Sequence, residues 1–237
     1  MSNRFDGQVA LVAGGTGALG SAIALALLAE GAQVTVTYRH AEEFAALQQL
    51  AGTARLDGAQ TDVTDLAAAE QLVGDLVRAR GRLDILVNAV GGYVGGAPLW
   101  QADPAALERM LGLNLRSGHA LARAAAPVLL RSGRGAVVNI AARAALEHGA
   151  GSAAYNASKA AALALFDSLA ADLTGSGVRV NSVLPSIIDT PANRAAMPDA
   201  DHARWPTVEQ VARVYVWLAS PDAELVSGAA VPAYGLS

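Results

Sequence analysis

The sequence predicts a single α/β domain built on a doubly wound parallel sheet, and three observations support this fold class. Apolar runs of strand length alternate with helical runs along almost the whole chain, an order that places helices on both faces of a parallel sheet. The first apolar run continues directly into a glycine-rich turn and a helix. The length of 237 residues suits one domain over residues 1–237 with one continuous sheet.

Composition excludes several classes of site and partner. The chain has no cysteine and four scattered histidines, so no disulfide or metal site is expected, and the cytoplasm is the expected location. A net charge of −4 provides no basic surface for nucleic acid or an anionic membrane. The longest apolar run, residues 22–29, is too short to cross a bilayer, and the polar N-terminus resembles no targeting signal. A small molecule is therefore the expected partner.

The first predicted strand, residues 9–13, leads through a glycine-rich turn into a helix over residues 21–30. In the pattern Gly15-x-Gly17-x-x-Gly20, the glycines allow a diphosphate to approach the backbone, and its charge then lies at the free amides of the helix N-terminus. The flanking strand and helix favour this nucleotide-binding interpretation over a tight turn without a ligand. The residues expected to contact the nucleotide here are Gly14, Gly15, Thr16, Gly17, Ala18 and Leu19.

The end of the second predicted strand, residues 34–39, bears on the choice of nucleotide. Sheets that bind NAD place an acidic residue here for the ribose 2′-hydroxyl, whereas this chain has Tyr38-Arg39-His40. Because the Arg39 guanidinium suits a 2′-phosphate, the sequence predicts NADPH as the cofactor. The alternative is a surface arginine that binds nothing.

A predicted helix over residues 41–50 is followed by a short strand that is expected to reach Asp62 and Val63. Thr64 or Asp65 then caps a helix that ends near residue 80. Strand ends of a parallel sheet face the ligand, so Asp62 and Val63 are candidates for contact with the adenine. Asp62 is equally compatible with a plain turn.

The next buried strand, residues 83–87, ends at Asn88 and Ala89, which are further candidates for cofactor contact. The loop behind them, residues 91–96, places four glycines around Tyr93 and Val94. Glycines at the carboxyl end of a parallel strand indicate a loop that moves or that closely surrounds a ligand. Tyr93 is expected to form a stacking wall for the substrate.

The middle of the chain holds a long predicted helix over about residues 104–130 and a strand over residues 135–140. Asn114 lies at mid-length in that helix, where a polar amide either holds a buried water or faces solvent. A loop over residues 141–152 then leads into a helix around Tyr155, whose alanine- and leucine-rich continuation lacks glycine and proline.

Tyr155 and Lys159 form the strongest candidate for chemistry, because Lys159 is the only lysine among 17 basic residues. Four residues apart on a helix, both side chains project from one face. An ammonium about 4 Å from a phenol is worth roughly 4 kcal/mol at an effective dielectric of about 20, which lowers the tyrosine pKa from about 10 towards about 7. The pair predicts a proton donor usable at neutral pH. The alternative is an ordinary polar pair on a solvated face.

The last part of the chain places a predicted strand over residues 178–184 before a polar, proline-bounded segment over about residues 186–206. A connection of about twenty residues is too long for a plain loop, so it predicts a lid over the active site. A helix over residues 207–218 and a closing strand over residues 227–232 complete the predicted fold.

The order of these motifs resembles the short-chain dehydrogenase/reductase family over nearly the whole chain. The motifs are the glycine turn, the Asn88 loop, Asn114, the Tyr155-x-x-x-Lys159 pair and the loop from Pro185 to Thr190. The resemblance implies a Rossmann fold in which Tyr155 is the general acid, Lys159 lowers its pKa and holds the nicotinamide ribose, and Asn114 positions a proton-relay water. It also implies that Ile188 and Thr190 bind the carboxamide, and that the chain forms a homo-oligomer, a tetramer or a dimer.

Position 142 departs from the family pattern, in which a catalytic serine stands thirteen residues before the tyrosine and not an alanine, as here. Losing one such donor typically costs about 2.7–4 kcal/mol in the barrier. The dihydropteridine reductase branch also lacks this serine, and the chain resembles it in the loop 91–96 and in the run 189–205. This resemblance implies the reduction of a conjugated pterin. The residues expected to face the substrate are Tyr93, Ala142, Ser152 and Trp205.

Two alternatives to an NADPH-dependent reductase of this branch stay open at the level of the sequence. In the first, the chain is a carbonyl or 3-oxoacyl reductase in which Ser152 or His148 replaces the missing hydroxyl. In the second, it is a catalytically silent NADP-binding protein, although such a protein has no need of the pair Tyr155 and Lys159.

Overall fold

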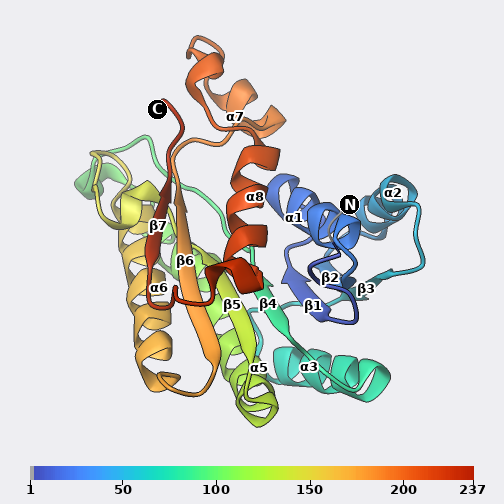
Figure 1. Ribbon diagram of the computed structural model, residues 1–237. Helices are drawn as coiled ribbons and strands as arrows, with labels where there is room; N and C mark the ends of the chain where they lie inside the picture. Colours follow the sequence, from blue (N-terminus) through green and yellow to red (C-terminus); the bar gives the residue numbers. More distant parts are fainter. Residues whose placement is uncertain (1–2) are drawn as a thin grey trace.

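The centre of the protein is a seven-stranded parallel sheet with the strand order β3-β2-β1-β4-β5-β6-β7. The computed structural model describes residues 3–237. Figure 1 shows the sheet with its helices on both faces, which confirms the predicted doubly wound α/β fold. The strands are β1 (Val9–Ala13), β2 (Gln33–Tyr38), β3 (Leu56–Gln60), β4 (Ile85–Asn88), β5 (Gly135–Ile140), β6 (Val178–Pro185) and β7 (Ala230–Ala233).

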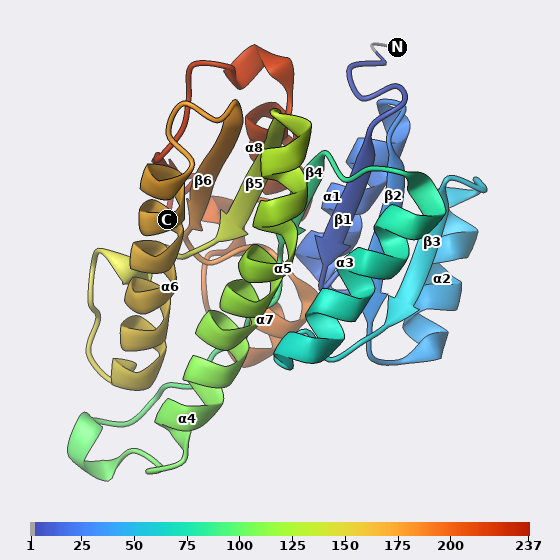
Figure 2. The same ribbon diagram turned by 90° about the horizontal axis from the view of Figure 1, so that it is seen from below.

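Helices cover the two faces in separate groups. One face packs against α1 and α8, which contact each other, and the opposite face packs against α3, α5 and α6, seen in front of the strands in Figure 2. The helices are α1 (Ala18–Ala29), α2 (Ala41–Ala51), α3 (Leu66–Arg80), α4 (Ala106–Leu111), α5 (Ser117–Ser132), α6 (Ala153–Asp172), α7 (Pro191–Ala196) and α8 (Val208–Ala219).

The apolar run of β1 divides its side chains between two cores. Ala10 and Val12 lie in the core beneath α1 and α8, whereas Val9 and Leu11 lie in the core beneath α3 and α5. Because side chains alternate along a strand and both faces are covered, a central parallel strand has no polar face to show in the sequence.

Three predicted segments differ from the observed elements. The third strand ends at Gln60 and does not reach Val63, because Asp62 accepts hydrogen bonds from Thr64 and turns the chain there. The predicted helix 104–130 consists of α4, a π-helical turn η2 (Gly112–Arg116) and α5. The predicted lid has structure of its own, since α7 and a short 3₁₀ turn, η4 (His202–Arg204), lie within it.

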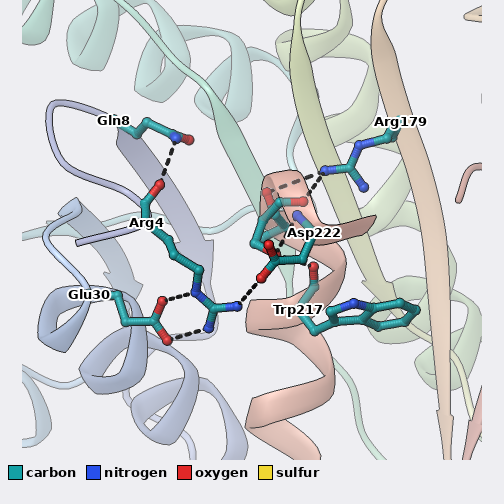
Figure 3. A network of polar contacts seen from close by, with 8 residues as sticks. Arg4, Gln8, Glu30, Arg179, Trp217 and Asp222 are labelled. Atoms are coloured by element: carbon teal, nitrogen blue, oxygen red, sulfur yellow. Dashed lines mark hydrogen bonds and ion pairs between the residues drawn. The ribbon is translucent and has the colours of Figure 1, made fainter. Parts of the chain in front are cut away.

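Two arginines tie distant parts of the chain together at the amino end of the sheet (Figure 3). Arg4 donates to both carboxylate oxygens of Glu30, at the end of α1, and to Asp222 beyond α8. Arg179, near the start of β6, donates to the last carbonyls of α8. These contacts lie opposite the carboxyl ends of the strands, where a parallel sheet binds its ligands. Among residues 3–237, no helix combines the length and apolar character that a membrane crossing requires.

Candidate active site

The first part of the site lies where the chain order reverses between β1 and β4, the position at which open parallel sheets bind ligands. Gly14 has a φ of +73°, which favours glycine, and a Cβ on it would lie 3.2 Å from the Ala89 carbonyl group. The turn therefore packs directly on the loop that follows β4. Gly17 and Ala18 are exposed at the start of α1. The Gly17 amide donates to the Gly14 carbonyl at 3.1 Å, so the amides that this helix start offers to a diphosphate are those from Ala18 onward.

Three charged residues lie near the ends of β2 and β3 and the glycine turn: Arg39, Asp62 and Glu43, the last of which sequence reasoning missed. Arg39 is exposed directly after β2. Hydrogen bonds from Thr64, and then the charge of Arg39, hold the pKa of Asp62 below its usual value. Glu43, in the first turn of α2, accepts a hydrogen bond of 2.8 Å from the Thr16 hydroxyl. An acid thus stands beside the glycine turn, although none ends β2.

Asn88 closes β4 inside the protein. Its Nδ2 donates to Asn139 Oδ1 at 3.0 Å, and its Oδ1 accepts from the Val90 amide. Asn88 is fully buried, so its side chain holds the strand ends in place, while the adjoining Ala89 donates its amide to the Ala13 carbonyl. Val63 is buried in the core beneath α3.

Tyr155 and Lys159 lie on α6 with different surroundings. Lys159 is 3% exposed, its Nζ donates to the Ile140 carbonyl at 3.2 Å, and burial lowers its pKa to about 8. Burial, and then the neighbouring Tyr93, raise the pKa of Tyr155 to about 12. The predicted shift of Tyr155 towards 7 is therefore wrong for this chain. In residues 3–237 no hydrogen bond links the two side chains, and loss of solvation is the larger effect.

Asn114 is buried in the π-helical turn and uses its whole amide group on the protein. Its Oδ1 accepts from the Gly92 amide at 2.9 Å, and its Nδ2 donates to the Gly92 carbonyl at 3.1 Å and to Ser158 Oγ at 2.9 Å. The side chain thus fixes the glycine loop against α6. Ser158, one residue before Lys159, was not predicted because a serine within a helix carries no distinguishing pattern.

Tyr93, predicted to face the substrate, lies beside Tyr155. The two ring centroids are 4.9 Å apart with an interplanar angle of 72°, and the Tyr93 and Ser152 hydroxyl oxygens are 3.0 Å apart. Ala142 is 7% exposed in the turn after β5, which packs against α6. His148 is exposed and lines a different hollow on the surface. The structure therefore brings Ser152, and not His148, to the tyrosines.

The segment beyond β6 carries the remaining candidates. Thr190 caps α7 by accepting from the Asn193 amide, and the Ile188 carbonyl accepts from Asn193 Nδ2 at 2.8 Å. Trp205 is 7% exposed and packs against the ring of His202. It therefore packs within the segment that was predicted to be a lid, and it presents little of its surface to a substrate.

Comparison with known proteins assigns the family. A family model described as enoyl-(acyl carrier protein) reductase matches residues 14–235. "Dehydrogenase/reductase SDR family member 6" of Danio rerio is 31% identical over 243 residues, which cover 96% of each chain. This chain belongs to the short-chain dehydrogenase/reductase family.

Two further proteins are similar over at least nine-tenths of either chain. Galactitol 2-dehydrogenase of Rhizobium johnstonii is 36% identical over 96% of this chain and 94% of its own. The solved structure of a short-chain type dehydrogenase/reductase from Mycobacterium ulcerans has a TM-score of 0.93 at 28% identity and covers 99% of this chain and 90% of that one. The chain is thus an oxidoreductase of this family, for which dependence on a pyridine nucleotide is typical.

Proposed function

We propose that this chain is an NADPH-dependent reductase of dihydropteridine-reductase type that transfers hydride to a small conjugated or carbonyl substrate. The observation that carries the proposal is the contact of Tyr155 with the exposed ring of Tyr93, one helical turn before a buried Lys159, at a site where Ala142 offers no hydroxyl. A conjugated ring spreads negative charge over its own atoms and needs fewer donors. Tyr93, 64% exposed, offers such a ring an aromatic face.

Each residue of the site has a role that follows from its surroundings. A bound nicotinamide supplies the hydride. Tyr155 supplies the proton, since a pKa of about 12 keeps its phenol protonated at neutral pH. Lys159 is cationic below a pKa of about 8. A positive charge near Tyr155 stabilises the phenolate that remains after proton transfer, by at most about 4 kcal/mol. One donor of its ammonium group binds Ile140, which leaves the others for the nicotinamide ribose.

The remaining cofactor contacts follow the order of the strands. The diphosphate lies at the turn from Gly14 to Leu19, where Gly17 and Ala18 are open to solvent. Arg39 binds the 2′-phosphate, and Asp62 with Val63 borders the adenine. Ile188 and Thr190, at the carboxyl end of β6, bind the carboxamide. Glu43 disfavours NADPH relative to NADH. Its carboxylate accepts a hydrogen bond from Thr16, and its negative charge would repel a 2′-phosphate.

The chain also has proposed properties beyond the site. We expect a homo-oligomer, a tetramer or a dimer, in keeping with the family resemblance, and a cytoplasmic location, which the absence of cysteine suits.

A second candidate function is the reduction of simple ketones or the oxidation of polyols. It is favoured by the paired hydroxyls of Tyr93 and Ser152, which offer a hydrogen bond that a localised oxygen needs. Two similar proteins are a galactitol 2-dehydrogenase and a D-threitol dehydrogenase, so polyols belong in any screen of substrates.

The proposal is tested by screening the oxidation of NADPH against quinonoid dihydropterin, quinones and small ketones, and the reduction of NADP⁺ by small polyols, with Tyr155→Phe as the matched variant. We expect turnover of the dihydropterin and a loss in kcat of several decades in the variant, because the phenylalanine fills the same space but has no proton to give. Retention of most of the activity by Tyr155→Phe would show that the proton comes from elsewhere. Faster turnover of ketones or polyols than of the dihydropterin would select the second candidate.

A further inference from the structure

The hydroxyl groups of Tyr93 and Ser152 form a pair beside the proton donor. Their oxygens are 3.0 Å apart, and the Tyr93 ring meets the Tyr155 ring edge-on with centroids 4.9 Å apart. Ser152 stands three residues before Tyr155 and directly before α6, yet its side chain makes no capping bond to the helix. Its hydroxyl pairs with Tyr93, so one hydroxyl of the pair comes from the start of α6 and the other from the loop after β4.

The loop that carries Tyr93 is shaped around this pair. A Cβ at Gly95 would lie 2.2 Å from Tyr93 Oη and 2.7 Å from Ser152 Oγ, so a side chain there is incompatible with the paired hydroxyls. On the other side, Asn114 holds Gly92 through both its amide and its carbonyl. Tyr93 is therefore exposed along its ring but fixed at its backbone and at its hydroxyl. An exposed aromatic that only covered a surface would need neither restraint.

A count of donors shows what the pair can offer. Each hydroxyl has one O–H donor and lone pairs that accept. One O–H of Tyr93 or Ser152 is used between them, and the other stays available to a third partner. Tyr93 is also close enough to raise the pKa of Tyr155, after the larger effect of burial. The available O–H therefore belongs to a hydroxyl pair whose Tyr93 ring packs edge-on against the ring of Tyr155, whereas Ala142 has no donor on its side chain.

We propose that the Tyr93 hydroxyl, oriented by Ser152, donates a hydrogen bond to the substrate atom that Tyr155 protonates, and so replaces the hydroxyl that Ala142 lacks. The inference rests on the proposed function, since it requires hydride transfer to an acceptor such as a carbonyl. In that step hydride bonds to the carbonyl carbon, the π electrons move to oxygen, and the Tyr155 proton bonds to that oxygen to give the alcohol, while the nicotinamide is left oxidised. Tyr93 keeps its own proton, and Ser152 is a positioning residue.

The principal experiment compares kcat of the wild type with that of Tyr93→Phe, which keeps the aromatic wall and removes the hydroxyl. Small ketones, small polyols and quinonoid dihydropterin are each assayed with both phosphorylated and unphosphorylated nicotinamide nucleotides. On the small ketone or polyol that the wild type turns over fastest, where charge builds up on a single oxygen, we expect a loss of about 10²-fold in kcat, near the lower end for one oxyanion donor, with KM for the nucleotide within about threefold. A loss below threefold overturns the proposal.

Two further variants separate a donor from a structural role. Ala142→Ser in the Tyr93→Phe background should recover at least about tenfold in kcat, because it returns a hydroxyl to the same acceptor. Ser152→Ala should lower kcat and Ser152→Thr, which keeps a hydroxyl, should restore it. Failure of Ala142→Ser to recover kcat in the Tyr93→Phe background overturns the inference. A wild-type enzyme that prefers NADH or polyols would contradict the proposed function. The ratios of kcat between the variants and the wild type could still be measured.

An NMR measurement that does not depend on turnover completes the test. In protein labelled at the tyrosine Cζ carbons, Ser152→Ala should shift the ¹³C resonance of Tyr93, assigned by its loss in Tyr93→Phe, because the phenol loses its hydrogen-bond partner. The resonances of Tyr38, at the end of β2, and of Tyr234, directly after β7, should stay in place. An unmoved Tyr93 resonance would show that the hydroxyl pair does not form in solution and would overturn the proposal.

Discussion

At the scale of single residues, Lys159 is an ammonium that folding takes out of water. Its pKa falls from 10.5 in a solvated chain to about 8, because burial disfavours the charged form. A lysine with a lowered folded pKa contributes stability that is present above its unfolded pKa and is lost as the pH falls through the folded pKa. As the pH falls from 10.5 to 8, the free energy of unfolding therefore decreases because of this residue. At pH 7 the full cost of burying the charged lysine is present.

Lys159→Met should consequently abolish turnover while making the protein more stable at pH 7, by up to about 3 kcal/mol from the size of the shift. The gain should shrink as the pH rises from 8 towards 10, where the wild-type lysine is already neutral in the folded chain. Urea unfolding of both proteins at pH 7 and pH 10 measures this difference. Lys159→Arg is the matched control. Its guanidinium stays charged at both pH values, so the stability gain of Lys159→Met over Lys159→Arg should not shrink between pH 7 and pH 10. A stability difference that does not depend on pH would contradict the lowered pKa.

Arg39 and Glu43 present opposite charges to the proposed ribose site. Arg39→Ala should raise the dissociation constant of NADPH by about 10- to 150-fold, the equivalent of roughly 1.5–3 kcal/mol for a charged hydrogen bond, and leave that of NADH almost unchanged. Glu43→Gln keeps an acceptor for Thr16 and removes the negative charge, so it should strengthen binding of NADPH. Fluorescence titration with both nucleotides measures each constant. Equal losses for NADPH and NADH in Arg39→Ala would show that Arg39 does not read the 2′-phosphate.

At the scale of elements, buried runs with clear ends are predicted accurately from the sequence. The strands predicted over residues 9–13 and 135–140 coincide with β1 and β5, because each is a short apolar run bounded by polar or glycine residues. The strand predicted over residues 83–87 begins later, at Ile85. Asp84 is the reason, since its carboxylate accepts from the Val9 amide and from Arg82 before the strand begins.

Elements that depend on distant contacts are not predictable in this way. The predicted helix over residues 104–130 gave no sign of the π-helical turn at Asn114, because that asparagine bonds Gly92 and Ser158, which are 22 and 44 residues away. The same holds for the partnership of Tyr93 with Ser152, which are 59 residues apart. The sequence identified most members of the candidate site, but the contacts that orient them arise only when loops after different strands meet at one edge of the sheet.

At the scale of the whole molecule, the two ends of the sheet have separate tasks. The carboxyl ends of the strands carry Tyr155, Lys159 and the glycine turn, whereas the amino ends carry the contacts that join α1, α8 and β6 (Figure 3). This division allows stability to be changed at one end without a change of chemistry at the other.

Arg179 is the residue that tests this separation. Its Nη1 donates to the Leu218 carbonyl at 2.6 Å and its Nη2 to the Ser220 carbonyl at 3.0 Å, so it satisfies carbonyls that the end of α8 leaves unpaired. Arg179→Met should lower the free energy of unfolding by about 1.5–3 kcal/mol, the range for hydrogen bonds to a charged group. Urea unfolding measures the loss.

Arg4→Met is the matched control for Arg179→Met, because it removes a guanidinium from the same end of the sheet. The side chains of Arg4 and Glu30 are 28% and 23% exposed, so their ion pair is partly screened, and its loss should cost about 1 kcal/mol or less. Both variants should keep the kcat of the wild type per folded molecule, since neither arginine reaches the carboxyl ends of the strands. A fall in kcat for Arg179→Met at a temperature where it is fully folded would show that the two ends of the sheet are coupled.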